Sequence, residues 1–211
     1  GVFADSADDA EQMLAAGADF VTVTTTRPED AAVVVKQLDG LVGLRLPEIS
    51  AEDLDTLTAA GLDFVVVGPE TTAAGVVDSE DLGLVLEADE SADESQLRAL
   101  ASLELEGVLV GRPIEGFTLQ RRILLTRIAM LCGAPLLVCV GPGATSAELG
   151  ALRESGVSAV LLPAQTKASV VTALLEQLDA VSPRSRRSSR GGDLALLSRP
   201  GAWESEHEDN D

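Results

Sequence analysis

The chain has 211 residues, 45% of them hydrophobic, which is enough apolar material for one domain with a sizeable core. Its formal net charge of −20 argues against binding to nucleic acid or to an anionic membrane, because both are negatively charged. No apolar run reaches the roughly 18 residues of a membrane-spanning helix, and we expect a cytoplasmic protein.

One pattern of helix, glycine and strand recurs along the chain. Ala15-Ala-Gly-Ala-Asp-Phe-Val-Thr-Val23 is repeated as Ala59-Ala-Gly-Leu-Asp-Phe-Val-Val-Val67 and, more loosely, as Glu154-Ser-Gly-Val-Ser-Ala-Val-Leu-Leu162. In each copy a glycine follows the helical pattern, which suits the left-handed conformation that closes a helix. The Val-rich run after it is typical of a strand buried in a parallel sheet.

Read in chain order, the sequence predicts eight strands that alternate with helices. The predicted strands are residues 1–4, 19–24, 42–46, 64–68, 83–88, 107–111, 136–141 and 159–163. The fourth helix, near 71–77, has to be short, the sixth, 119–132, is the longest, and an eighth follows at about 166–181. Capping boxes are predicted at Ser6–Asp9, Thr26–Glu29, Ser50–Asp53, Ser91–Glu94 and Thr145–Glu148.

This alternation indicates an α/β protein with a parallel sheet and helices outside it. Eight evenly spaced units favour a closed (β/α)8 barrel of the TIM type over residues 1–181. The alternative is an open, doubly wound sheet. The cysteines, Cys132 and Cys139, lie in apolar surroundings and are expected to be buried, reduced thiols.

Residues 182–211 differ in composition from the rest. Residues 182–192 are basic and of low complexity, 193–197 are mostly apolar, Trp203 is the only Trp, and 204–211 are acidic. The composition predicts a flexible, disordered C-terminal tail. It is either solvated, or it docks on a protein partner or on a second copy through residues 193–203. Its opposite charges nearly cancel, so almost all of the negative charge falls on the barrel.

In a (β/α)8 barrel the functional groups follow the C-terminal ends of the strands. The only His is His207, in the tail, and no Lys lies in a predicted strand. The barrel therefore has no imidazole for a metal or a catalytic triad, and no obvious Schiff-base nucleophile. The groups that remain for binding or catalysis in the barrel are carboxylates, arginines and hydroxyls.

Two charged residues interrupt apolar strands, Arg45 in strand three and Glu87 in strand five. If both side chains point into the barrel, we expect them to pair, since an unpaired charge there is costly. Together with Glu70 and Asp89 they are the candidate catalytic residues, and Arg45 would hold a carboxylate group. Glu87 and Asp89 are also the candidate ligands of a divalent metal such as Mg²⁺. The alternative is a purely structural ion pair, or two side chains at the rim.

The stretch VCVGPGATSAEL (138–149) places a Gly-x-Gly turn between a strand and a capped helix. Backbone N–H groups at such a turn can bind phosphate. Residues 138–164 resemble the last quarter of the phosphate-binding (β/α)8 barrel superfamily. The resemblance implies a phosphate site at Gly141, Gly143, Thr145 and Lys167, although this chain has Pro163-Ala-Gln-Thr-Lys167 where that superfamily tends to have Gly and Ser. The alternative is a plain strand-to-helix connector.

Two classes of function follow from these residues. The first is a small-molecule enzyme of the lyase or aldolase type, acting on a carboxylate- or phosphate-bearing substrate with an arginine–carboxylate or divalent-metal site. The second is a non-catalytic barrel that acts as a scaffold or interaction protein through its C-terminal tail. The fold alone does not choose between them, because (β/α)8 barrels carry many chemistries.

Overall fold

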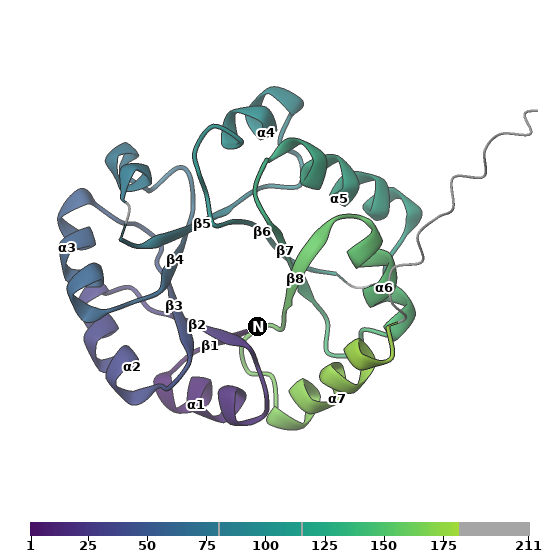
Figure 1. The fold of residues 1–211 in the computed structure, drawn as a ribbon, viewed down its shortest axis with the longest axis horizontal. Helices are drawn as coiled ribbons and strands as arrows, with labels where there is room; N and C mark the ends of the chain where they lie inside the picture. Colours follow the sequence, from purple (N-terminus) through teal and green to yellow (C-terminus); the bar gives the residue numbers. More distant parts are fainter. Residues whose placement is uncertain (80, 115, 182–211) are drawn as a thin grey trace, which may run out of the picture.

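The computed structural model, which describes residues 1–79, 81–114 and 116–181, forms a parallel eight-stranded barrel ringed by helices (Figure 1). Neighbouring strands pair in sequence order from β1 to β8. The strands are β1 (Val2–Ala4), β2 (Phe20–Thr24), β3 (Leu41–Arg45), β4 (Phe64–Val67), β5 (Gly83–Glu87), β6 (Gly107–Ile114), β7 (Leu136–Val140) and β8 (Val157–Leu161).

The sheet closes between its first and last strands. Val2 forms a parallel bridge with Leu162, the N–H of Phe3 donates to the Leu162 carbonyl over 2.9 Å, and the N–H of Leu162 donates to the Gly1 carbonyl over 3.0 Å. The predicted (β/α)8 barrel is therefore confirmed, and the open doubly wound sheet is excluded.

Helices lie outside the barrel, as the alternation predicted. They are α1 (Ala7–Ala15), α2 (Ala31–Gln37), α3 (Ala51–Ala60), α4 (Glu94–Leu100), α5 (Leu119–Leu131), α6 (Ser146–Glu154) and α7 (Ala168–Asp179). Between β4 and β5 only a 3-10 helix forms, η2 (Ala74–Asp78), so the prediction of a short fourth helix is confirmed. The prediction that the helix near 119–132 is the longest is also confirmed.

The side chains of the strands alternate between two apolar layers. Outward residues pack under the helices, whereas inward residues fill the barrel, where Phe20 and Phe64 meet edge to face with ring centroids 5.9 Å apart. The buried residues inside the barrel are Phe3, Phe64, Val66, Val85, Leu109, Leu137, Cys139 and Leu161. The barrel is thus a packed core, and solvent reaches it only at its ends.

The bounds of two strands differ from the prediction by two residues or more. β6 runs to Ile114 and not to Gly111, because the pairing with β7 resumes after an irregularity between Val110 and Ile114. β8 begins at Val157, two residues earlier than expected. A bulge of this kind re-aims the residues within it, and here it carries Arg112 to the end of the barrel.

Two of the five predicted capping boxes are confirmed, at Ser50–Asp53 and Thr145–Glu148. At the third, Ser6 is the N-cap of α1 and its hydroxyl accepts a hydrogen bond from the N–H of Asp9. The other two predictions are wrong. The helix after β2 starts without a side-chain cap, so the Thr26–Glu29 box does not form. Asp93 and Gln96, and not Ser91 and Glu94, form the capping box of α4.

Both cysteines are free and buried, as predicted. Within the described residues, none of the helices has the length and apolar character needed to cross a membrane. The predicted tail, residues 182–211, lies outside the described residues.

Candidate functional site

A solvent-filled hollow of about 640 Å³ lies at the C-terminal ends of β3 to β6. We call it the mouth cavity. It contains all four candidate catalytic residues predicted from the sequence. The charged residues that line it are Arg45, Glu70, Glu87, Asp89, Glu90 and Arg112. Strand ends therefore bring together side chains that are far apart in the sequence.

Arg45 and Glu87 form the predicted ion pair. Nη2 of Arg45 donates to Oε2 of Glu87 over 3.1 Å, and Nε lies 2.7 Å from Oε1. The second contact does not have hydrogen-bond geometry, so buried Oε1 is held by charge alone. The side chains are 43% and 28% exposed, which places the pair at the floor of the mouth cavity, in contact with solvent.

The inner core lies directly beneath this pair. The guanidinium of Arg45 stacks over the ring of Phe3, 5.4 Å from its centroid. Cys139 is the nearby thiol, and burial raises its pKa to about 11, although the charge of Arg45 acts in the opposite direction. The thiol is therefore protonated at neutral pH and does not serve as a nucleophile.

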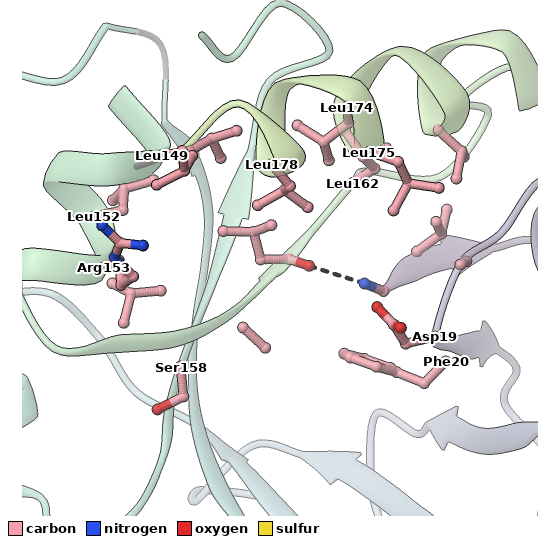
Figure 2. A pocket seen from close by; sticks show the side chains of 18 residues that line it. Asp19, Phe20, Leu149, Leu152, Arg153, Ser158, Leu162, Leu174, Leu175 and Leu178 are labelled. Atoms are coloured by element: carbon pink, nitrogen blue, oxygen red, sulfur yellow. Dashed lines mark hydrogen bonds between the residues drawn. The ribbon is translucent and has the colours of Figure 1, made fainter. Parts of the chain in front are cut away.

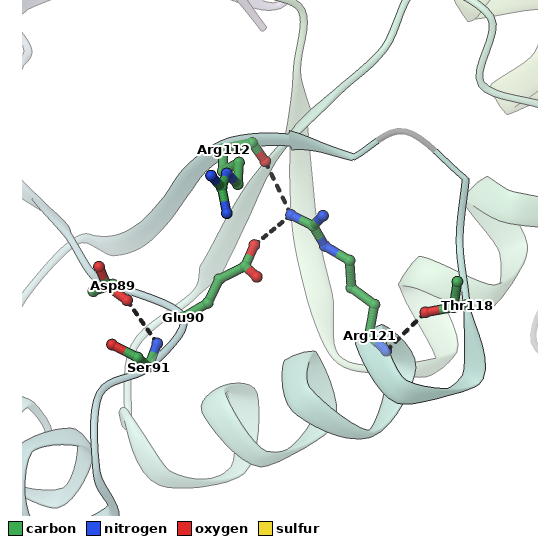
Figure 3. Close-up of polar contacts among 6 residues, drawn as sticks. All are labelled: Asp89, Glu90, Ser91, Arg112, Thr118 and Arg121. Carbon is green, nitrogen blue, oxygen red and sulfur yellow. Dashed lines mark hydrogen bonds and ion pairs between the residues drawn. The ribbon is translucent and has the colours of Figure 1, made fainter.

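The loop after β5 is tied to α5 at the edge of the cavity (Figure 3). The guanidinium of Arg121 binds the carboxylate of Glu90 and also donates to the Arg112 carbonyl over 3.1 Å. Nη2 of Arg127 donates to the Ala92 carbonyl over 2.9 Å. These contacts join the loop to α5 along the edge of the cavity.

Asp89 belongs to the same loop. Its Oδ1 accepts a hydrogen bond of 2.7 Å from the N–H of Ser91. The hydrogen bonds from Ser91 lower the pKa of Asp89, and the positive charge of Arg112 lowers it further. Asp89 is therefore an ionised group at neutral pH, engaged with its own loop.

Two charged side chains in the cavity are not engaged in a hydrogen bond or a salt bridge with any described residue. Among the described residues, the side chains of Glu70 and Arg112 take part in no hydrogen bond and no ion pair. Arg112 lies in the irregular stretch of β6 and Glu70 follows β4, so their elements lie on either side of β5. A cation and an anion are thus available to a ligand in one cavity.

The structure gives no support to the predicted metal site. Glu87 is engaged by Arg45, and Asp89 by Ser91. In the part of the chain that the structure describes, no three His, Cys, Asp or Glu side chains are grouped so that they could hold a metal ion. A metal site at Glu87 and Asp89 therefore stays a prediction.

The Gly141–Gly143 turn opens onto a separate hollow of about 260 Å³, next to Phe117. An internal carboxylate already occupies the start of α6, because Oε2 of Glu148 accepts from the N–H and the hydroxyl of Thr145, over 3.0 and 2.9 Å. These hydrogen bonds lower the pKa of Glu148. Neither Thr145 nor Lys167 lines this hollow, so of the predicted phosphate set only Gly141 and Gly143 lie there.

A further cavity of about 280 Å³ lies near the N-terminal ends of the strands, between β8, α6 and α7 (Figure 2). Leucine side chains from α6 and α7 line one side of it, among them Leu149, Leu174 and Leu178. Asp19 and Arg153 are its charged residues. Its wall is mostly apolar, which contrasts with the charged mouth cavity.

Sequence reasoning located Arg45, Glu70, Glu87 and Asp89 but left Arg112 out of the site. The signal that could have identified Arg112 is its position directly after the predicted strand 107–111, where functional groups of a (β/α)8 barrel lie. Its entry into the cavity depends on the continuation of β6, which the predicted strand did not include.

No protein-family model and no curated protein matches the sequence. Solved structures with similar folds include phosphoribosyl anthranilate isomerase from Thermus thermophilus, with a TM-score of 0.61 and 16% identity over 86% of this chain and 98% of that chain. Orotidine 5'-phosphate decarboxylase from Pyrococcus horikoshii gives a TM-score of 0.63 and 12% identity over 84% of this chain and 98% of that chain.

Tryptophan synthase from Mycobacterium tuberculosis gives a TM-score of 0.61 and 15% identity over 86% of this chain and 88% of that chain. These likenesses confirm the resemblance to the (β/α)8 barrel superfamily as a likeness of fold. At such identities they do not identify a reaction or a ligand for this chain.

Proposed function

We propose that this protein is a small-molecule enzyme of the lyase or aldolase type that binds a carboxylate-bearing substrate in the mouth cavity. One observation carries the proposal: the Arg112 guanidinium and the Glu70 carboxylate, neither of which forms a side-chain hydrogen bond or salt bridge within the described residues, line the same cavity as the Arg45–Glu87 pair. Guanidinium groups bind carboxylates strongly and with fixed geometry.

Each residue has a distinct role in this proposal. Arg112 binds the substrate carboxylate, and Arg45, held in place by Glu87, contributes a second positive charge. Glu70 removes a proton from the carbon next to that carboxylate, so the C–H bond breaks and its electron pair moves onto the carboxylate oxygens. The two guanidinium groups stabilise the charge that develops there.

Binding is tested by calorimetric titration with malonate, succinate and inorganic phosphate. We expect a dicarboxylate to bind, and Arg112→Gln to weaken binding about 10-fold or more, because a charge-assisted hydrogen bond is lost. Arg98→Gln is the matched control, since Arg98 pairs with Glu94 on α4 and does not line the cavity. No binding of any of the three anions would contradict the proposal.

Chemistry is tested separately, by following the exchange of malonate C–H protons with deuterated water by NMR. The wild-type protein is expected to accelerate the exchange, and Glu70→Gln is expected to abolish the acceleration while malonate still binds. If malonate binds but its proton exchange is not accelerated, the protein is an anion-binding barrel and the proposal that it is an enzyme is wrong.

A further inference from the structure

The outer face of α5 carries an apolar stripe that no described residue covers. Leu119, Ile123 and Met130 are 73%, 63% and 78% exposed, although large apolar side chains are normally withdrawn from water. Spacings of four and seven residues place them on one side of the helix, opposite to buried Leu125 and Ile128. α5 is therefore apolar on both its inner and its outer side.

The same helix has an unusual charge for this protein. Residues 119–131 contain three arginines and no acidic residue, in a chain whose net charge is −20. Arg122 is partly exposed and pairs with Glu154 of α6. Arg121 is bound to Glu90 and Arg127 to the Ala92 carbonyl, so Arg122, 39% exposed, is the arginine that borders this face. A segment that covers the face should therefore be apolar and carry an acidic residue near Arg122.

One segment of the chain has that composition. Residues 193–211, which lie outside the described part of the structure, contain three leucines, the only tryptophan and six acidic residues against a single arginine. Leu194, Leu196, Leu197 and Trp203 supply apolar area, and the acids from Glu204 onward supply the opposite charge. The segment and the α5 face are thus complementary in both respects.

The connection is long enough for the segment to reach α5 of its own chain. α6 lies between α5 and α7 (Figure 1), and packed helices are about 10 Å apart, so α5 is about 20 Å from the helix that ends the barrel. Residues 182–192 are eleven in number and span up to about 36 Å when extended. A short tether also gives the segment a high effective concentration at this face.

We infer that residues 193–211 dock on the outer face of α5 in the same chain, with Trp203 and the leucines over Leu119, Ile123 and Met130. This contact is independent of the chemistry of the mouth cavity. It removes from water an apolar surface whose exposure is unfavourable. It also makes the C-terminal segment part of the folded protein.

Trp203 is the only tryptophan, so the tryptophan fluorescence of the full-length protein reports on the surroundings of this one residue. We expect its emission to be blue-shifted and protected from acrylamide quenching relative to the urea-unfolded chain. Ile123→Glu and Met130→Glu should remove both effects, and circular dichroism should verify that the barrel stays folded. Val33→Glu is the matched control, because Val33 is 65% exposed on α2.

Two results would overturn the inference. The first is an emission equal to that of the unfolded chain, which would mean that Trp203 is in water. The second is a blue shift that disappears on dilution together with a dimeric mass in light scattering, which would mean that the segment docks on a second copy. A blue shift that persists on dilution of a monomer and is lost in both α5 variants supports the inference.

Discussion

Arg45 and Glu87 are joined by a contact of 2.7 Å although their strands, β3 and β5, are separated by β4 and do not pair. Inward side chains of alternate strands share one layer in a (β/α)8 barrel, so these two residues meet above the apolar interior. The pair positions a guanidinium group between the inner core and the solvent of the mouth cavity.

The strength of this pair can be measured by a double-mutant cycle with Arg45→Gln and Glu87→Gln. We expect a coupling of about 1 kcal/mol in the free energy of unfolding, because the pair is partly exposed and solvent screens it. The cycle for Arg98 and Glu94, an exposed pair on α4, should give a smaller coupling, about 0.3–0.5 kcal/mol. Both couplings are measured by urea unfolding. Equal values for the two pairs would show that the position at the barrel mouth does not strengthen the Arg45–Glu87 pair.

Thr22 of β2 offers a second test. Its side chain is fully buried, and Oγ1 has no hydrogen-bond partner among the described residues. Thr22→Val replaces the hydroxyl with a methyl group of similar size, and we expect it to stabilise the protein by about 1 kcal/mol. Thr24→Val, at an exposed position of the same strand, should give no such gain. A loss of stability in Thr22→Val would mean that the hydroxyl is hydrogen-bonded in solution.

The cap of α6 predicts a dependence on pH. Hydrogen bonds from Thr145 lower the pKa of Glu148, so this carboxylate contributes stability above its ordinary pKa of 4.5 and loses it as the pH falls through the lowered value. Glu148→Gln should therefore be less stable than the wild type at neutral pH, and the difference should shrink in acid. The free energy of unfolding of both proteins, measured from neutral pH into acid, checks this prediction. A stability difference between the two proteins that stays the same at every pH would contradict it.

Thiol reactivity tests the packing of the inner core. Because burial raises the pKa of Cys139 from its ordinary 9.0 to about 11, its thiolate fraction at neutral pH is about 100-fold lower. In a Cys132→Ala variant, Ellman's reagent should label Cys139 at least about 100-fold more slowly in the native than in the unfolded protein. Rapid labelling of the native variant would mean that the inner core is open.

Much of the fold could be predicted from the sequence, because local signals and the global architecture agree. Gly17, Gly61 and Gly156, the glycines of the three repeats, all have positive φ angles, of 101°, 77° and 94°. Each closes its helix and leads into a buried strand, as the repeat predicted. Wrong caps arose where neighbouring residues compete, as when Asp93 and not Ser91 caps α4.

The candidate site was less accessible to sequence reasoning. Arg45 and Glu87 are visible in the sequence as charges within apolar strands, and their pairing follows from the barrel. Arg112 lies in the irregular part of β6, which the residue pattern did not indicate. The contact of Glu148 with Thr145 was predicted as a capping box, but its effect on the proposed phosphate turn was not.

The central claim, that the mouth cavity binds a small anion, is tested most directly by NMR titration of the labelled protein with malonate. The account predicts chemical-shift changes at the amides of Glu70, Glu87 and Arg112 and at the side-chain Nε–H of Arg45, with loss of these changes in Arg112→Gln. Changes confined to Gly141 and Gly143, or no changes at any of these positions, would contradict it.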